Sequence, residues 1–333
     1  MKAVVMTEPG APEVLQLTDL PEPEIADPGQ VKVRLHAAGI NPIDTKLRSR
    51  GVFFENAYPA VLGCDGAGEI VEVGNAVTDF VPGDRVWFCH GGLGREQGNY
   101  AEFTVIAADE IAAMPESLDY VQAAAAPLVL ITAWEGLYER ARIRAGQDVL
   151  IHAGAGGVGH VAIQLASLRG VRVITTVGSE EKAELVRGLG ADEVILYREQ
   201  DLVEAVSTLT DGRGADVVFD TVGGDVFKQS IEATAHYGDL VTLLDPGTGI
   251  DWKEARNRNL RIGFELMLTP MLRDLPRARA NHVDILNACA SLIDAGQLNI
   301  HVSEVLSLDK AALAHQQIEE GHTTGKRVLS ITA

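Results

Sequence analysis

The sequence is poor in cysteine and in positive charge, and each shortage excludes a class of protein. Its 333 residues include three cysteines, Cys64, Cys89 and Cys289, which form no C-x-x-C pair and no even disulfide framework. A reducing, cytoplasmic compartment is therefore expected. Lysine and arginine number 28 against 47 aspartates and glutamates, which gives a net charge of −19. Nucleic acids and membrane surfaces are anionic and would repel such a chain, so neither is an expected partner, although a local basic pocket can still bind one anionic ligand.

Long apolar runs are also missing. No run reaches the roughly 18 residues that a membrane span requires. The longest, "VQAAAAPLVLITAW", is shorter and rich in alanine, and we expect a buried helix or connection there. The first residues, "MKAVVMTEPGAPEV", lack the apolar segment and cleavage site of a secretory signal. The length suits two domains of ordinary size, each with its own core.

The first 120 residues predict a mostly antiparallel β domain. Short apolar or alternating runs such as "VKVRLHAAGI" and "YAEFTVI" are separated by turn signals such as "PEPEIADPGQ" and "VPGD". No helix-length periodic segment precedes residue 120. "NPID" is typical of a turn, because Asn-Pro favours one.

From about residue 148, predicted strands and helices alternate with short links. "QDVLIHAG", "VRVITTV", "DEVILY", "ADVVFDTV" and "DLVTLL" are the strands, and "DVFKQSIEATAHYG" is one of the helices between them. This order predicts an α/β fold with a doubly wound parallel sheet, with "LRIGFELML" as a last edge strand. A helix then leads to a strand–helix–strand tail that we expect to rejoin the β domain. The predicted domains are 1–123 with 269–333, and 124–268.

A glycine-rich loop lies between the first of these strands and a helix. Its pattern is G-x-G-x-x-G, which is specific for a dinucleotide when it follows a strand and opens a helix within a βαβ unit. The first glycine permits the tight turn, the second lets the backbone approach a pyrophosphate, and the third lets helix and strand pack closely. The candidate cofactor-binding residues of the loop are Gly154, Ala155, Gly156, Gly157, Val158 and Gly159.

The end of the second strand favours NADP over NAD. NAD sites usually place an acidic residue there to bind the ribose hydroxyls, but this strand ends at Val177. Gly178 leaves room, Ser179 can donate a hydrogen bond, and Lys182 supplies positive charge, which together suit a 2′-phosphate. The alternative is that Ser179 only caps the next helix and Lys182 is a solvated helix residue.

Several stretches resemble the medium-chain dehydrogenase/reductase superfamily. "AGAGGVG", "GSEEKAELVRGLGADEVILY" and "TGKRVL" keep the family's order, as does "YPAVLGCDGAGEIVEVGNAVTDFVPGDRV". The match is to the zinc-free quinone oxidoreductase (zeta-crystallin-like) group. This resemblance implies a GroES-like catalytic domain, a Rossmann domain that binds NADPH, a cleft between them, and a homodimer formed through the Rossmann edge strand.

The resemblance also implies roles for individual residues. Ser179, Lys182 and Tyr197 match residues that contact the 2′-phosphate, although Tyr197 could instead cap the core at the end of a strand. Thr132 matches a threonine near the nicotinamide and is a candidate catalytic residue. Val222 and Gly223 match the wall of the cofactor cleft. Leu244 matches an apolar residue under the nicotinamide, and Lys326 matches a lysine that often faces the cofactor.

The zinc ligands of related alcohol dehydrogenases have no counterpart here. Their three positions fall at Asn41, Cys64 and near Leu128, and two of these cannot ligate zinc in the usual way. The four-cysteine structural lobe is absent too. A site made by Cys64, Asp65 and His90 is an alternative without recognisable spacing. We therefore expect no metal.

Without a Lewis acid, hydride acceptors such as quinones and α,β-unsaturated carbonyls are favoured. Asn41 is the candidate donor of a hydrogen bond to the developing negative oxygen. Asp44 matches the family pattern and is interpreted as structural support more than as an acid. Relatives often carry a tyrosine at the position of Lys46. Phe53 is the closest match in sequence to the tyrosine that donates the proton in enoyl-thioester reductases.

The proton therefore comes from water or Lys46, or no fixed acid is needed. The sequence predicts an NADPH-dependent quinone or enone reductase. The alternatives are a narrower 2-alkenal or enoyl reductase and a non-catalytic NADPH-binding protein.

Overall fold

The computed structural model describes residues 1–55, 57–321 and 323–331, and the chain divides into two compact units. The first unit comprises Met1–Leu128 with Leu268–Ala333, and the second comprises Val129–Met267. The first division lies within helix α3 (Pro127–Trp134). This division reflects compactness alone, so the domain limits predicted from the sequence stay a prediction.

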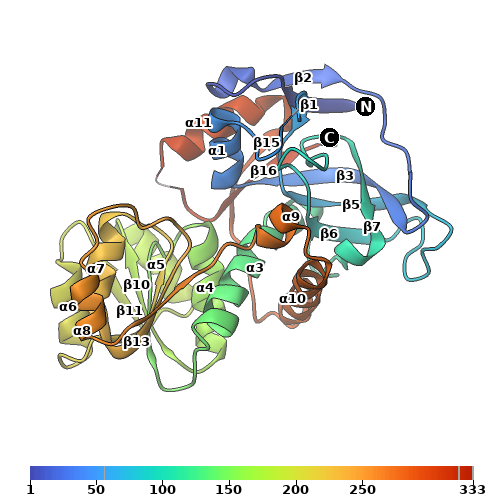
Figure 1. Cartoon of the computed structure of the whole chain (residues 1–333). Helices are drawn as coiled ribbons and strands as arrows, with labels where there is room; N and C mark the ends of the chain where they lie inside the picture. Colours follow the sequence, from blue (N-terminus) through green and yellow to red (C-terminus); the bar gives the residue numbers. More distant parts are fainter. Residues whose placement is uncertain (56, 322, 332–333) are drawn as a thin grey trace. The chain divides into compact units, whose positions relative to one another are not determined.

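In the described part of the chain, the first unit contains a three-stranded and a seven-stranded sheet (Figure 1). The strand orders are β2-β1-β4 and β15-β16-β3-β5-β6-β8, with β7 also paired to β3. Pairing is antiparallel throughout except between β15 and β16. The strands are β1 (Lys2–Met6), β2 (Gln16–Asp19), β3 (Gln30–Ile40), β4 (Ala60–Val61), β5 (Asp65–Val73), β6 (Arg85–Cys89), β7 (Phe103–Ala107), β8 (Ala112–Ala113), β15 (Val302–Ser307) and β16 (Lys326–Ser330).

Alternation along β3 explains how this sheet forms its core. Val31, Val33 and Leu35 are fully buried and pack with Ile70 and Phe88 of neighbouring strands. Successive side chains of a strand point to opposite faces, so this period of two places one apolar face inward. The predicted mostly antiparallel β domain is confirmed, and β15, α11 and β16 confirm that the tail rejoins it.

Helix α1 (Pro42–Arg50) corrects the expectation that no helix precedes residue 120. "NPID" begins this helix rather than forming an isolated turn. The carboxylate of Asp44 accepts a hydrogen bond from the backbone N–H of Asn41 at 2.8 Å, and Pro42 occupies the first turn, where its missing N–H costs nothing. The helix shows no apolar periodicity because most of its buried residues are polar: Asp44, Thr45, Leu47 and Arg48.

The other helices of the first unit are shorter or lie after the second unit in the chain. They are α2 (Tyr120–Ala124), α9 (Thr269–Arg273), α10 (Pro276–Asp294) and α11 (Ala311–Glu319). None of the helices among the described residues has the length and apolar character that crossing a bilayer requires.

The second unit is a parallel sheet in the order β11-β10-β9-β12-β13-β14. The chain starts in the middle at β9, moves outward to β11, and returns to the other side with β12, so the order reverses between β9 and β12. Ligands of doubly wound sheets bind at this switch point. The strands are β9 (Asp148–Ile151), β10 (Arg172–Val177), β11 (Glu193–Leu196), β12 (Ala215–Asp220), β13 (Thr234–Thr242) and β14 (Arg261–Phe264).

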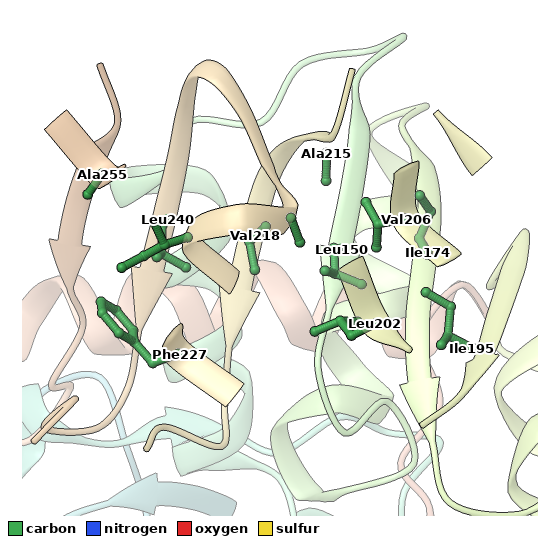
Figure 2. Packing of buried hydrophobic residues seen from close by; sticks show 12 residues of the cluster. Leu150, Ile174, Ile195, Leu202, Val206, Ala215, Val218, Phe227, Leu240 and Ala255 are labelled. Carbon is green, nitrogen blue, oxygen red and sulfur yellow. The ribbon is translucent and has the colours of Figure 1, made fainter. Parts of the chain in front are cut away.

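Helices cover this parallel sheet. Figure 2 shows Leu150 and Val218 of the sheet packed with Leu202 and Val206 of α6 and Phe227 of α7. Burying each such side chain contributes roughly 1.5–3 kcal/mol. The predicted Rossmann fold is thereby confirmed. Its helices are α4 (Gly157–Leu168), α5 (Glu180–Gly188), α6 (Leu202–Leu209), α7 (Asp225–Ala233) and α8 (Trp252–Asn257).

Two element limits in this unit differ from the sequence prediction. The predicted helix "DVFKQSIEATAHYG" is too long, since α7 ends at Ala233 and β13 begins at Thr234. Thr234 already pairs with Ala215 of β12, and an irregularity in the register precedes the pairing of Asp239. Tertiary pairing thus overrides the local helical pattern. The predicted edge strand is confirmed as β14, although it covers only the first part of "LRIGFELML".

Candidate functional site

The glycine loop lies at the switch point, between β9 and α4. A Cβ on Gly154 would come within 2.1 Å of Thr175 Oγ1, and one on Gly159 within 2.3 Å of the carbonyl oxygen of Ala153. Both positions therefore require glycine. Gly156 is the N-cap of α4 and has no side chain to satisfy the first N–H groups of the helix. These groups and the helix dipole are left to an anion, so the loop fits the pyrophosphate of a dinucleotide.

The remaining predicted residues of the loop lie in the same segment. Gly157 and Val158 are the first two residues of α4, and Ala155 is buried just before it. The structure thus brings the six predicted loop residues into one turn and helix start.

A second group of predicted residues gathers after β10 and β11. A Cβ on Gly178 would lie 2.7 Å from the phenolic oxygen of Tyr197, so glycine lets the Tyr197 ring lie over this turn. Ser179 caps α5, because its Oγ accepts a hydrogen bond from the backbone N–H of Lys182 at 3.4 Å. The Ser179 hydroxyl keeps its own hydrogen for a ligand. Capping and ligand binding are therefore compatible.

Arg198 is a residue that the sequence analysis missed at this position. Its Nε would lie 3.4 Å from a Cβ on Gly178. The pKa of Lys182 is lowered by partial burial and by the positive charge of Arg198, with Glu181 opposing. Two cations close enough to repel each other attract a dianionic phosphate. The only signal in the sequence was that Arg198 directly follows Tyr197.

The ends of β12 and β13 bring together Val222, Gly223 and Leu244. The backbone N–H groups of Val222 and Gly223 both donate to Asp220 Oδ1 at 2.9 Å, and Thr242 Oγ1 donates to Asp220 Oδ2 at 2.9 Å. Gly223 has φ of 77°, and a Cβ there would lie 3.0 Å from Leu244 Cβ. Buried Asp220 thus holds the turn at the carboxyl edge of the sheet.

The first unit contains a cluster around Asn41. Asn41 Nδ2 donates to Asp65 Oδ2 at 2.9 Å, and Lys326 Nζ donates to Asn41 Oδ1. Lys326 Nζ also lies 3.5 Å from Asp65 Oδ2, and Asp65 Oδ1 accepts from the backbone N–H of Leu128 at 2.8 Å. All three side chains are nearly inaccessible to solvent. Burial raises the pKa of Asp65, while Lys326 and Asn41 act in the opposite direction.

The contacts of Asn41 define the orientation of its amide. An ammonium can only donate and an ionised carboxylate can only accept, so Oδ1 must face Lys326 and Nδ2 must face Asp65. From the sequence, Asp65 was considered only as a possible metal ligand, and its role in orienting Asn41 was missed. Lys326 was predicted to face the cofactor, and that role stays a prediction.

Asp44 lies in the first turn of α1. Its Oδ2 accepts from the backbone of Asn41 at 2.8 Å and from the hydroxyl of Tyr100 at 3.1 Å. Burial raises the pKa of Asp44 to about 7, against the hydrogen bond from Asn41, while nearby Asp65 raises it further. The Asp44 side chain is fully buried. These contacts support the beginning of the helix.

The structure places Lys46 in the first unit and Thr132 in the second. Lys46 is exposed on α1, and its pKa is lowered by desolvation and by Arg50. Thr132 is buried in α3. Their catalytic roles stay predictions.

The alternative metal site at Cys64, Asp65 and His90 has other contacts. His90 Nδ1 lies 2.7 Å from Glu110 Oε2, and Arg279 binds the same carboxylate at 2.9 Å. Across residues 1–55, 57–321 and 323–331, no group of three or more His, Cys, Asp or Glu side chains could hold a metal ion.

Two family models match the chain. Residues 27–116 match the alcohol dehydrogenase GroES-like domain, and residues 189–329 match a model described as zinc-binding dehydrogenase. Together with the Rossmann sheet and its glycine loop, these matches define a medium-chain dehydrogenase/reductase.

Similar proteins narrow the class. The chain is 37% identical to a quinone oxidoreductase of Pseudomonas aeruginosa, with 96% of each chain covered, and 33% identical to a 2-haloacrylate reductase of a Burkholderia species, with 91% covered. The crystal structure of Escherichia coli quinone oxidoreductase complexed with NADPH aligns with a TM-score of 0.88 at 31% identity, covering 99% of this chain and 100% of the other. The chain belongs to the quinone oxidoreductase group of the medium-chain dehydrogenases/reductases, and it is an enzyme of that type.

Proposed function

We propose that this enzyme transfers hydride from NADPH to quinones or α,β-unsaturated carbonyl compounds without zinc. The observation that carries the proposal is the defined orientation of the buried Asn41 amide between Lys326 and Asp65. When bound, NADPH supplies the hydride. An amide has two N–H donors, of which one binds Asp65. The other is the donor we assign to the substrate oxygen on which negative charge develops.

Lys326 supports the zinc-independent part of the proposal. Its ammonium lies against Asn41, which stands at one of the positions where related alcohol dehydrogenases carry a zinc ligand, and against Asp65, the residue after Cys64. An amide and a backbone N–H at Leu128 complete the surroundings of Asp65, and these groups are poor zinc ligands. The positive charge beside Asp65 is therefore supplied by the protein.

NADPH is proposed as the cofactor because the turn after β10 offers cations and no acid at the strand end. Gly178, Ser179, Lys182 and Tyr197 would surround the 2′-phosphate, and Arg198 adds a second positive charge. The relative from Escherichia coli was crystallised with NADPH.

A second candidate is a narrower reductase of polarised carbon–carbon double bonds. The observation that favours it is the similarity to a 2-haloacrylate reductase, whose name specifies an unsaturated acid as substrate. Both candidates share the cofactor and the Asn41 cluster, so substrate choice alone separates them.

Oxidation of NADPH and NADH, followed by absorbance with quinones, short enals and enoyl thioesters, tests these functions. Quinone-dependent oxidation of NADPH supports the proposal, and turnover of enals alone favours the second candidate. Equal use of NADH would refute the NADPH assignment. Tight NADPH binding without any turnover would favour a non-catalytic NADPH-binding protein.

Changing Arg198 tests the 2′-phosphate site. We expect R198A to raise KM for NADPH about tenfold and to leave KM for NADH unchanged, because a charge-assisted contact to phosphate is lost. The matched control is R187A, which removes an exposed arginine of α5 whose partner is Glu180 at 2.6 Å. Steady-state kinetics with both cofactors measures the effect. An equal change for NADPH and NADH would contradict the assignment.

We also propose that a second copy of the chain binds at β14. This strand pairs on one side with β13 and is the edge of the sheet, and Phe264 and Leu266 are more than half exposed there. An unpaired edge can add a strand from another molecule. Light scattering is expected to give twice the chain mass of 35.6 kDa, and F264E is expected to reduce it to that of the single chain. A wild-type monomer would refute the proposal.

A further inference from the structure

We infer that His152 is a positioning residue for the dinucleotide loop: its neutral ring, protonated at Nε2, connects the loop backbone to α7 through Thr176 and Ser230. The inference rests on the proposed binding of NADPH at this loop. His152 is the first residue after β9 and is almost completely buried. It faces away from solvent, so it acts through the loop rather than on the substrate.

The partners of Ser230 determine which ring nitrogen carries the proton. Ser230 Oγ donates its hydrogen to the carbonyl oxygen of Val226 at 2.7 Å. His152 Nε2 lies 3.0 Å from the same Oγ. Because a hydroxyl has one hydrogen, Ser230 must accept from His152, so Nε2 carries a hydrogen.

The contacts of Thr176 at the other ring nitrogen are compatible with this tautomer. Thr176 Oγ1 accepts the backbone N–H of Ala153 at 3.0 Å and lies 3.3 Å from His152 Nδ1. Its hydroxyl hydrogen is free to point at Nδ1, which accepts it in the Nε2–H form of the ring. The hydrogen bonds therefore run in one direction, from Ala153 through Thr176, His152 and Ser230 to Val226.

These hydrogen bonds stabilise a part of the loop whose backbone conformation is unfavourable. Ala153 has φ of 50°, a left-handed conformation that residues with a Cβ rarely adopt. Thr176 fixes it through two bonds, one from Ala153 to Oγ1 and one from the N–H of Gly154 to the Thr176 carbonyl oxygen at 3.0 Å. Gly154 begins the pattern that receives the pyrophosphate. Thr176 thus contributes two of the hydrogen bonds that hold the loop backbone in place.

A second proton on the His152 ring would disrupt this row of hydrogen bonds. Burial lowers the pKa of His152 to about 4, with the nearby carboxylate of Asp220 opposing. The oxygens of Asp220 accept hydrogen bonds from the β12–α7 turn and from Thr242. A second N–H at Nδ1 would meet the hydrogen of the Thr176 hydroxyl, so the hydroxyl would have to turn and Nδ1–H would compete with the N–H of Ala153 for Oγ1. The neutral ring is therefore the form that supports the loop.

The tautomer is tested directly by ¹⁵N NMR of the full chain labelled at histidine. The His152 signals are assigned by their loss in H152N. At neutral pH we expect a protonated Nε2 and an unprotonated Nδ1. An Nδ1–H tautomer or a doubly protonated ring would overturn the inference, and neither result depends on whether NADPH binds.

Binding of NADPH, measured by fluorescence titration, tests the positioning role. We expect T176V to raise Kd for NADPH about tenfold, because the N–H of Ala153 loses its buried acceptor. The matched control is T210V, since buried Thr210 accepts a hydrogen bond from the N–H of Gly214 at 2.9 Å. Thr210 precedes β12 and so lies at the amino end of a strand, whereas the glycine loop follows the carboxyl end of β9. We expect T210V to leave Kd within about twofold. Equal Kd values for the two variants would refute the inference.

Two conservative changes at His152 separate its two bonds. H152N keeps an acceptor near Nδ1 for Thr176, and H152Q keeps a donor near Nε2 for Ser230. We expect H152N to retain NADPH affinity within about threefold and H152Q to lose about as much as T176V. The reverse order would contradict the inference. Failure of the wild-type chain to bind NADPH would instead refute the proposed function while leaving the tautomer result standing.

Discussion

Replacing Lys326 by methionine is expected to destabilise the first unit by about 3–5 kcal/mol, because Asp65 remains buried without its cation. Both side chains are at least 97% buried, and their charged atoms are 3.5 Å apart. Urea unfolding of K326M, followed by a probe in the first unit, measures the loss. The loss should shrink as the pH falls. The Asp65 pKa will be raised above its unfolded value in this variant, so the protonated carboxyl group needs no counterion at low pH, and the penalty grows as the pH rises.

The double variant K326M/D65N provides the control for this prediction. Removing both charges leaves no unpaired ion, so the double variant should be more stable than K326M alone. If the two changes simply added, or if K326M unfolded like the wild type at every pH, the ion pair would not be the source of the stability.

Replacing Asn41 by alanine is expected to lower kcat/KM about 100-fold while leaving Kd for NADPH nearly unchanged. Loss of a single positioned donor to a developing oxyanion typically costs about 10²–10³ in rate. Asn41 carries this role in our proposal because Lys326 and Asp65 hold its amide in one orientation. Steady-state kinetics with a quinone and a separate titration with NADPH measure the two quantities.

A second buried asparagine serves as the control. Asn99 donates to the backbone carbonyl oxygens of Gly63, Cys64 and His90 at 2.9–3.1 Å and lies outside the proposed machinery. We expect N99A to lose stability of the same order as N41A but to keep kcat within about threefold. An equal fall in kcat for both variants would mean that Asn41 acts only through stability.

Most of the architecture could be predicted because its signals are local. The alternation of "VKVRLHAAGI" and the strand–glycine–helix order at "IHAGAGGVG" each lie within one short segment. Helix α1 was missed because its buried face is mostly polar: Asp44 accepts a hydrogen bond from Tyr100 and Arg48 pairs with Glu319, so tertiary partners take the place of an apolar stripe. The start of β13 was missed because its pairing with Ala215 is a property of the sheet.

The candidate site could be predicted where its residues are neighbours in sequence and not where they meet only in the fold. The glycine loop and the turn at Gly178 follow known spacings. Asp65 meets Asn41, Leu128 and Lys326 across 24, 63 and 261 positions, so no local pattern contains that cluster. Arg198 likewise could not be predicted, because it comes close to Gly178 only through the pairing of β11 with β10.

The place of β16 in the first sheet has a consequence for synthesis on the ribosome. The second unit, Val129–Met267, is one continuous stretch and can fold as soon as it emerges. The first sheet cannot close until much later, since β16 lies between β15 and β3 and is translated after both. Asn41 receives its ammonium partner only when translation has advanced 285 residues beyond it. A nascent chain would thus acquire its nucleotide loop before the amide that we assign to catalysis is oriented.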